Sequence, residues 1–189
     1  MRRILFCMIA AGSAALLLAA TGRTSVHRLH PEQPPPAHTG GFGEPTCLQC
    51  HFDGALNEPG GELRVDGLPE AYTPGETYTL DVLVAHDAME RGGFQMAARF
   101  AEGEDEGGQA GHFAADEADV TVDLAEGVEY IRQRASDPAP DSARWLVRWT
   151  APDTAKGPVA FHAAANASNG DESPFGDYVY TWEAVSRHP

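Results

Sequence analysis

Hydrophobic and polar residues alternate with a period of two over most of the chain after position 60. Runs of this kind occupy residues 77–84, 94–100, 120–124, 145–149, 159–163 and 178–182, and shorter runs occupy 62–65 and 128–131. Each run is bounded by Gly, Pro, Asn or Asp, which favour turns. This pattern of about seven or eight short strands predicts an all-β domain, an antiparallel β-sandwich.

The phase of the alternation predicts which aromatic side chains meet inside the sandwich. Phe94, Trp145, Trp149 and Phe161 fall on the apolar phase of their runs, so we expect them to fill the space between the two sheets. The acidic, Gly-rich run at 102–108 predicts a solvated loop between strands.

The first 43 residues differ in composition from the rest. Arg2 and Arg3 precede an uncharged apolar run from Ile4 to Ala20, the pattern of a secretory signal peptide over residues 1–20. An uncleaved membrane anchor is the alternative. Residues 21–43 contain four prolines and no hydrophobic periodicity, which predicts an extended linker, and residues 44–189 then form the domain. The protein is therefore expected to be periplasmic or extracellular, with no membrane contact beyond the signal segment.

The charge balance narrows the class of partner. The chain of 189 residues has 13 Lys and Arg against 28 Asp and Glu, a formal net charge of −15 at pH 7. Nucleic acids and anionic membranes would be repelled, whereas a basic partner protein is allowed.

One motif carries chemistry. Cys47 and Cys50, followed by His51, form a CxxCH sequence, which in an exported chain is the pattern of covalent c-type haem attachment. Two thiols three positions apart can bind the two vinyl groups of one porphyrin, and the adjacent histidine can ligate the iron as proximal ligand. A Cys47–Cys50 disulfide is the main alternative, and a redox pair or a metal site is a further one.

The sixth ligand of such a haem is left open by the sequence. Met96 and His112 are the candidates we single out, and His112 lies in an accessible Gly-rich loop. Met96 shares its phase with Phe94, however, which favours a place in the core. Further candidates are His86, Met89 and His162, and an open sixth position would admit a small ligand.

A polar loop precedes the last run. Residues 166–171 read NASNGD, and Gly176 and Asp177 follow shortly afterwards. Their side-chain oxygens could bind calcium, although Asn-Gly is also a strong hairpin signal and explains the loop without a metal.

Six stretches of the chain carry a family resemblance, at residues 47–51, 60–80, 92–99, 144–152, 159–171 and 176–180. Together they resemble the bacterial Reeler-like domains, also called choice-of-anchor V domains. The resemblance implies an exported immunoglobulin-like β-sandwich, often anchored at the cell surface by a C-terminal segment and frequently preceded by CxxCH, but no defined activity. The chain departs from this pattern by ending without that anchor, by Gln133 in place of a common histidine, and by His162 in place of a common tyrosine.

These observations give three hypotheses. The first is an exported monohaem c-type protein acting in electron transfer or haem-based sensing, with a basic redox partner. The second is a non-enzymatic exported binding module whose Cys47–Cys50 disulfide staples the N-terminal segment. The third is an exported metal-binding protein that uses Met96, His112 and His162.

Overall fold

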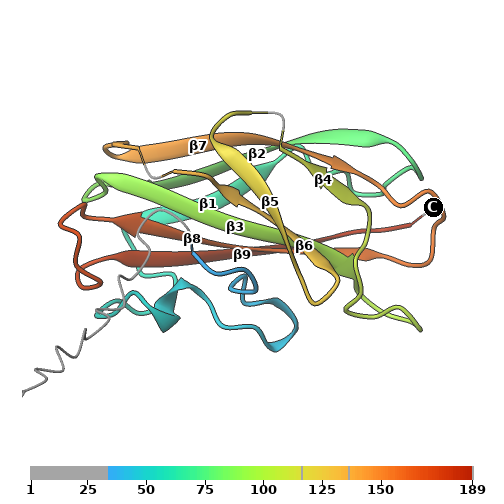
Figure 1. Cartoon of the computed structure of the whole chain (residues 1–189), viewed down its shortest axis with the longest axis horizontal. Coiled ribbons are helices and arrows are strands. Elements are labelled where there is room, and N and C mark those ends of the chain that lie inside the picture. The colour runs from blue at the N-terminus through green and yellow to red at the C-terminus, as the bar shows by residue number, and fades with distance from the viewer. Residues whose placement is uncertain (1–33, 116, 136, 189) are drawn as a thin grey trace, which may run out of the picture.

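The computed structural model describes residues 34–115, 117–135 and 137–188, so the predicted signal segment lies outside it. The described residues form two packed antiparallel sheets, which confirms the predicted immunoglobulin-like β-sandwich (Figure 1). The first sheet has the order β1 (Gly61–Asp66), β2 (Thr77–His86), β7 (Ser142–Thr150) and β4 (His112–Ala114). The second has the order β5 (Val120–Ala125), β6 (Val128–Gln133), β3 (Arg91–Phe100), β8 (Val159–Ser168) and β9 (Tyr178–Ser186).

The short edge strand β4 is the element that the sequence pattern misses. It has only three residues, too few to show an alternation, and we expected His112 in a loop. Phe113 pairs with Trp149 of β7 and Gly111 turns the chain at φ 69°. A Cβ at Gly111 would lie 2.2 Å from the carbonyl oxygen of Thr150, so only glycine permits this close approach.

Aromatic side chains fill the space between the sheets, as predicted. The ring centroids of Phe94 and Trp145 are 4.7 Å apart, and those of Trp149 and Phe161 are 4.8 Å apart. The indole N–H of Trp149 donates a hydrogen bond of 3.0 Å to the carbonyl of Ala110. All four aromatic side chains are buried, so the strand phases predicted for β3, β7 and β8 are confirmed.

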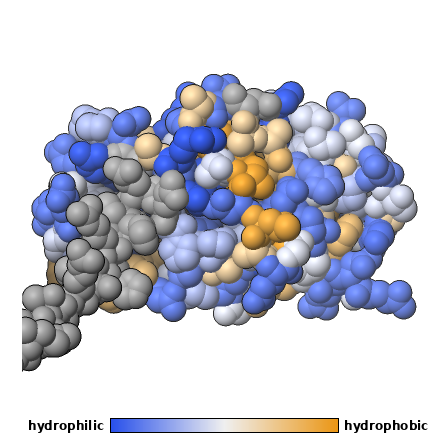
Figure 2. Space-filling model, in the orientation of Figure 1, coloured by the Kyte–Doolittle hydropathy of each residue, from blue (hydrophilic) through white to orange (hydrophobic). Residues whose placement is uncertain are grey.

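The alternation of apolar and polar residues does not predict burial correctly at the end of β5. Leu124 follows Val120 and Val122 in the alternation, yet 71% of its surface is exposed. It lies on an edge strand, next to the tight β5–β6 hairpin in which both Glu126 and Gly127 have positive φ. Figure 2 shows a largely hydrophilic face with a small hydrophobic patch over β5 and β6.

The outer face of the second sheet is covered by residues 34–59, which we call the strap. Its backbone holds the polar side chain of Gln95 on β3: the amide of His38 donates to Gln95 Oε1 at 2.7 Å, and Gln95 Nε2 donates to the carbonyl of Pro35 at 2.9 Å. Gln95 is therefore buried, although its phase predicts a solvated position. Residues 34–43, the described part of the expected linker, pack against this sheet, and residues 21–33 lie outside the described residues.

The strap contains two short 3-10 turns, η1 (Gly41–Gly43) and η2 (Cys47–Gln49), and both contact β8. Within the described ranges, no helix is long and apolar enough to cross a membrane.

Candidate functional site

The CxxCH motif folds into a single compact turn. The hydroxyl of Thr46 caps η2 by accepting the Leu48 amide at 3.3 Å. The amides of Cys50 and His51 both donate to the carbonyl of Cys47, at 3.1 and 3.0 Å. The turn therefore holds both cysteines and the histidine within five consecutive residues, and the two thiols are not joined.

The Cys47 thiol differs from the reactive thiol of a redox-active pair. Cys47 is half-buried, and burial raises the pKa of its thiol to about 12, with a smaller contribution from Cys50 and partial compensation by a backbone hydrogen bond. Reactive cysteines of oxidoreductases instead have lowered pKa values. The environment of Cys47 thus disfavours the redox-pair interpretation.

His51 is held through one ring nitrogen. Its Nδ1 lies 2.6 Å from Oδ2 of Asp177, which comes from the loop between β8 and β9 and is 126 positions further along the chain. The Asp177 side chain is fully buried, whereas 34% of the His51 side chain is exposed.

The carboxylate of Asp177 is kept ionised by its neighbours. Burial by itself would raise its pKa, but hydrogen bonds from His51, the Asn169 amide and Asn166 outweigh burial and hold the pKa below its ordinary value. The Asn169 amide lies 3.1 Å from Oδ1, and Asn166 Nδ2 lies 3.3 Å from Oδ2. Asp177 therefore presents a negative charge to His51.

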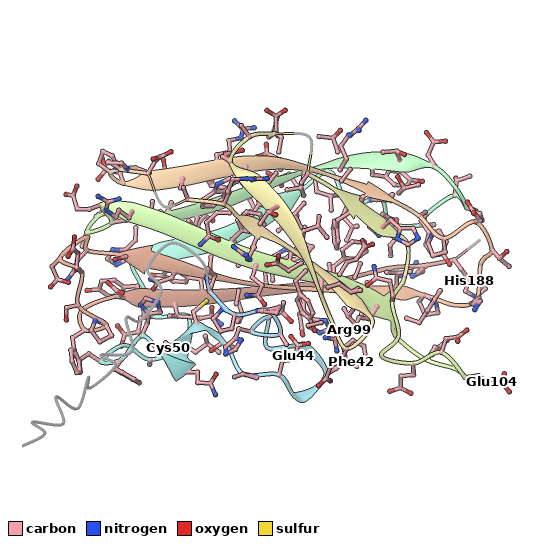
Figure 3. All side chains as sticks on the ribbon, in the orientation of Figure 1. Phe42, Glu44, Cys50, Arg99, Glu104 and His188 are labelled. Atoms are coloured by element: carbon pink, nitrogen blue, oxygen red, sulfur yellow. The ribbon has the colours of Figure 1, made fainter. Side chains whose placement is uncertain are left out.

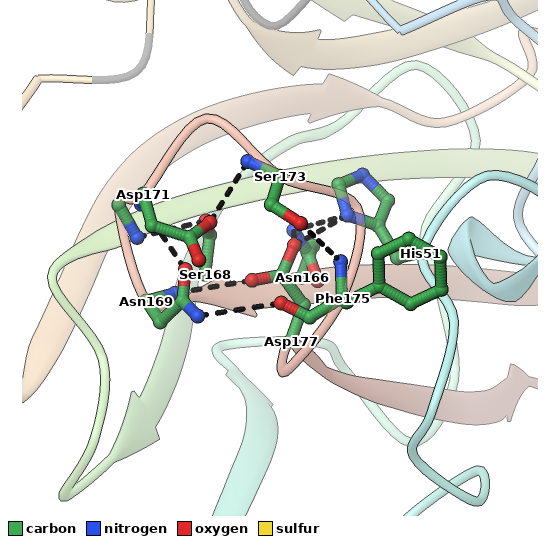
Figure 4. Close-up of polar contacts among 9 residues, drawn as sticks. His51, Asn166, Ser168, Asn169, Asp171, Ser173, Phe175 and Asp177 are labelled. Atoms are coloured by element: carbon green, nitrogen blue, oxygen red, sulfur yellow. Dashed lines mark hydrogen bonds and ion pairs between the residues drawn. The ribbon is translucent and has the colours of Figure 1, made fainter.

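The polar loop before β9 uses its oxygens internally (Figure 4). Side chains of this loop accept backbone amides two residues further on: Ser168 from Gly170, Asn169 from Asp171, Asp171 from Ser173, and Ser173 from Phe175. These consecutive turns explain the sequence without a metal, as the hairpin interpretation expects. Among the residues that the structure describes, no group of three or more His, Cys, Asp or Glu side chains could hold a metal ion.

A buried ion pair fixes the part of the strap that precedes the CxxCH motif. Glu44 pairs with Arg99 of β3, and both side chains are about nine-tenths buried. The hydroxyl of Tyr130 on β6 donates to Glu44 at 2.5 Å, and the Arg99 guanidinium lies 5.3 Å from the centre of the Phe42 ring. Figure 3 shows Phe42, Glu44 and Arg99 together, with Cys50 further along the same segment.

Apolar side chains are exposed around the motif. Phe52, directly after His51, packs against Phe175 with ring centroids 5.7 Å apart, and the two residues form an isolated β-bridge. Four of the seven large hydrophobic side chains that are exposed in the described residues belong to the strap or to this contact: Phe42, Phe52, Leu56 and Phe175. Of these four, Phe52 and Phe175 adjoin His51, so part of the surface beside the motif is apolar.

The candidate sixth ligands are dispersed. Met96 and Met89 are buried in the core. His86 ends β2 and stacks on Tyr178 at 3.8 Å, near the loop that holds His51. His112 pairs with Thr150 at the other end of the first sheet, about 30 Å away along the length of β2.

The alternation along β8 predicts a solvated position for His162, but most of its side chain is buried. It lies under Phe42, with ring centroids 5.4 Å apart, and burial lowers its pKa although the nearby Glu183 opposes this. The set Met96, His112 and His162 is not brought together, so nothing in the fold supports the metal-binding hypothesis. Gln133, where the sequence departs from the Reeler-like resemblance, is buried, and its Oε1 accepts a hydrogen bond of 2.8 Å from the Phe94 amide.

A shallow groove adjoins the motif. It has a volume of about 350 Å³ and lies between the strap and the outer faces of β8 and β9. Its walls are both polar and apolar, and they are formed by Thr39, Gly40, Thr46, Leu56, Asn57, His162, Thr181, Trp182 and Glu183.

Sequence reasoning found the motif but not its partner. Asp177 was singled out as part of a turn or calcium loop, and its contact with His51 joins two segments that are distant in sequence. No local pattern connects the two residues. An acidic residue in a Gly-Asp step before a strand was the only signal present.

Comparison with known proteins gives structural likenesses alone. No family model matches the chain, and neither does any curated protein. Solved structures that resemble it include the human F-spondin reeler domain, with 23% identity, a TM-score of 0.47, and coverage of 70% of this chain and 94% of that one. The Reelin-N domain of F-spondin has 20% identity and a TM-score of 0.49, with 74% and 94% covered. A cohesin module from a Clostridium perfringens family 33 glycoside hydrolase has 11% identity and a TM-score of 0.46, with 68% and 96% covered. These likenesses are distant, and the architecture described above rests on the chain's own strands and register.

Proposed function

We propose that this protein is an exported monohaem c-type protein that binds haem covalently at the CxxCH turn and acts in electron transfer or haem sensing. The observation that carries the proposal is the turn itself: Cys47, Cys50 and His51 share one hydrogen-bonded turn, and the thiols are unjoined. This donor set fits the group, because two thiols and one imidazole are what covalent haem attachment requires.

Attachment is chemically self-contained. Each S–H group adds across one vinyl double bond of the porphyrin, so that sulfur bonds to one carbon and hydrogen to the other, and no external oxidant is needed. Cys47 and Cys50 would form the two thioethers, and the Nε2 atom of His51 is available as proximal ligand because Nδ1 is engaged by Asp177. When bound, the haem supplies one-electron redox chemistry.

The surroundings of the motif support an apolar ligand. Phe52 and Phe175 are exposed next to His51 in an otherwise acidic protein, and exposed hydrophobic patches often mark binding sites. The predicted signal segment supports export, and the net charge of −15 suits a basic redox partner. Met96, His112 and His162 do not lie beside His51 in this fold.

The test is expression of the full chain with a c-type haem maturation system in a bacterial periplasm. The expected product is red, gains the mass of one haem, and gives a haemochrome spectrum in alkaline pyridine. Replacement of both Cys47 and Cys50 by Ser should abolish covalent haem and leave the domain folded. The matched control is Cys7→Ser, which removes a cysteine outside the motif and should change nothing in the mature protein.

A second candidate is a non-enzymatic exported binding module stapled by a Cys47–Cys50 disulfide. The groove of about 350 Å³ beside η2 favours it, since ligand-binding sites in proteins are usually concave. A colourless product that lacks haem, together with a mass two hydrogen atoms below that of the dithiol, would reject the haem proposal and support this candidate.

A further inference from the structure

The contact between His51 and Asp177 differs from an ordinary surface ion pair, because its carboxylate is buried and held in place by further hydrogen bonds. Asp177 is fully buried, it lies 2.6 Å from His51 Nδ1, and the Asn169 amide and Asn166 fix its carboxylate in place. Burial of a carboxylate is unfavourable unless its charge is satisfied. The fold therefore places a negative charge beside one particular ring nitrogen of His51, the Nδ1 atom.

This geometry decides which nitrogen of His51 bears the proton. A carboxylate accepts hydrogen bonds only, so Nδ1 must be the donor and Nε2 must keep its lone pair when the ring is neutral. Asn166 Nδ2 also lies 3.2 Å from Nδ1, but it donates to Asp177 as well, and it cannot donate to a nitrogen that is itself protonated. Histidines that bind metals commonly donate their other N–H to a carboxylate in this way.

We propose that Asp177 is the positioning residue of the haem site: it holds the His51 proton on Nδ1, presents Nε2 to the iron, and lowers the reduction potential. The inference rests on the proposed function. A negative charge on the far side of the imidazole makes the ring a stronger donor and favours ferric over ferrous iron, and second-sphere hydrogen bonding is one means by which proteins tune haem potential.

A purely structural role predicts different behaviour. If Asp177 only anchors the strap, any substitution that weakens the docking of the strap should have the same effects. Asn57 provides the matched control, because its side chain anchors the strap to Thr181 of β9 through two hydrogen bonds, of 3.1 and 2.8 Å, and does not contact His51. Asn57→Ala therefore loosens the strap and leaves the Asp177 carboxylate in place.

The first arm of the experiment needs no haem. The tautomer of His51 is measured by ¹⁵N NMR of the haem-free Cys47→Ser, Cys50→Ser domain in alkaline buffer, with Asp177 intact, as Asp177→Ala, and as Asn57→Ala. We expect the Nδ1–H tautomer with Asp177 present and in the Asn57 variant, and its loss in Asp177→Ala. A His51 protonated on Nε2 while Asp177 is intact overturns the inference, and that spectrum alone decides the point if Asp177→Ala does not fold.

The second arm measures the midpoint potential of the haem-loaded protein. Asp177→Asn keeps the shape and removes the charge, so the potential should rise, whereas Asn57→Ala should leave it unchanged. Equal potentials in wild type and Asp177→Asn, or equal shifts in the two variants, overturn the inference while the haem proposal stands. A wild-type protein that never acquires haem refutes the proposed function and the effect on the potential together, and the first arm still reports separately on His51.

Discussion

Trp149 offers the sharpest test of the sandwich. Its side chain is fully buried, packs edge to face against Phe161 at 4.8 Å, and donates to the Ala110 carbonyl at 3.0 Å. Truncation of a buried tryptophan to alanine costs about 3–5 kcal/mol. The lost hydrogen bond leaves a buried carbonyl unsatisfied and adds about 1 kcal/mol.

The expected loss for Trp149→Ala is thus about 4–6 kcal/mol, a large part of the roughly 5–15 kcal/mol that stabilises a typical domain. It corresponds to a fall of roughly 10–20 °C in melting temperature for a chain of this size. Urea denaturation followed by far-UV circular dichroism, with thermal melts, gives both numbers.

Two matched variants separate the contributions. Trp149→Phe keeps a ring in the site and removes the N–H donor, so it should lose about half as much or less. Leu146→Ala changes a residue on the opposite face of the same strand, where 48% of the side chain is exposed, and should stay within about 0.5 kcal/mol of wild type. Similar losses for Trp149→Ala and Leu146→Ala would refute the assignment of the faces of β7.

Three further predictions concern the strap and its sheet. Glu44→Ala leaves the buried Arg99 guanidinium without its anion, and a loss of this kind commonly lowers the free energy of unfolding by about 3–5 kcal/mol. Hydrogen–deuterium exchange measured by mass spectrometry should then show faster exchange of the strap amides, and unchanged exchange would contradict the role of this ion pair. Gly92→Ala places a Cβ 2.6 Å from that of Ala143 and should lose about 1–3 kcal/mol in urea titrations, and wild-type stability would show that the sheets can shift apart. Burial lowers the pKa of His162, so the stability that the neutral ring contributes is present above pH 6.5, its ordinary pKa, and is lost as the pH falls below that value. The melting temperature of His162→Gln should therefore depend less on pH than that of wild type between about pH 7 and 5. An equal pH dependence in the two proteins would contradict the burial of His162.

The sequence by itself determined the strand pattern and the motif. Alternation with a period of two is a property of each strand alone, so it identified the inward phase of β3, β7 and β8, and with it the burial of Phe94, Trp145 and Phe161. The spacing of Cys47 and Cys50 likewise predicts that both lie on one turn, because the turn is closed by backbone bonds between near neighbours.

The tertiary structure decided what lies on the outer face of the second sheet. Gln95, Arg99 and His162 have the phase of solvated residues, and the strap covers them because it docks there through contacts between distant segments. The pairing of His51 with Asp177 arises in the same way, across 126 positions. A local pattern reports which face of its own strand a residue occupies, but whether that face meets water or another segment depends on how the whole chain packs.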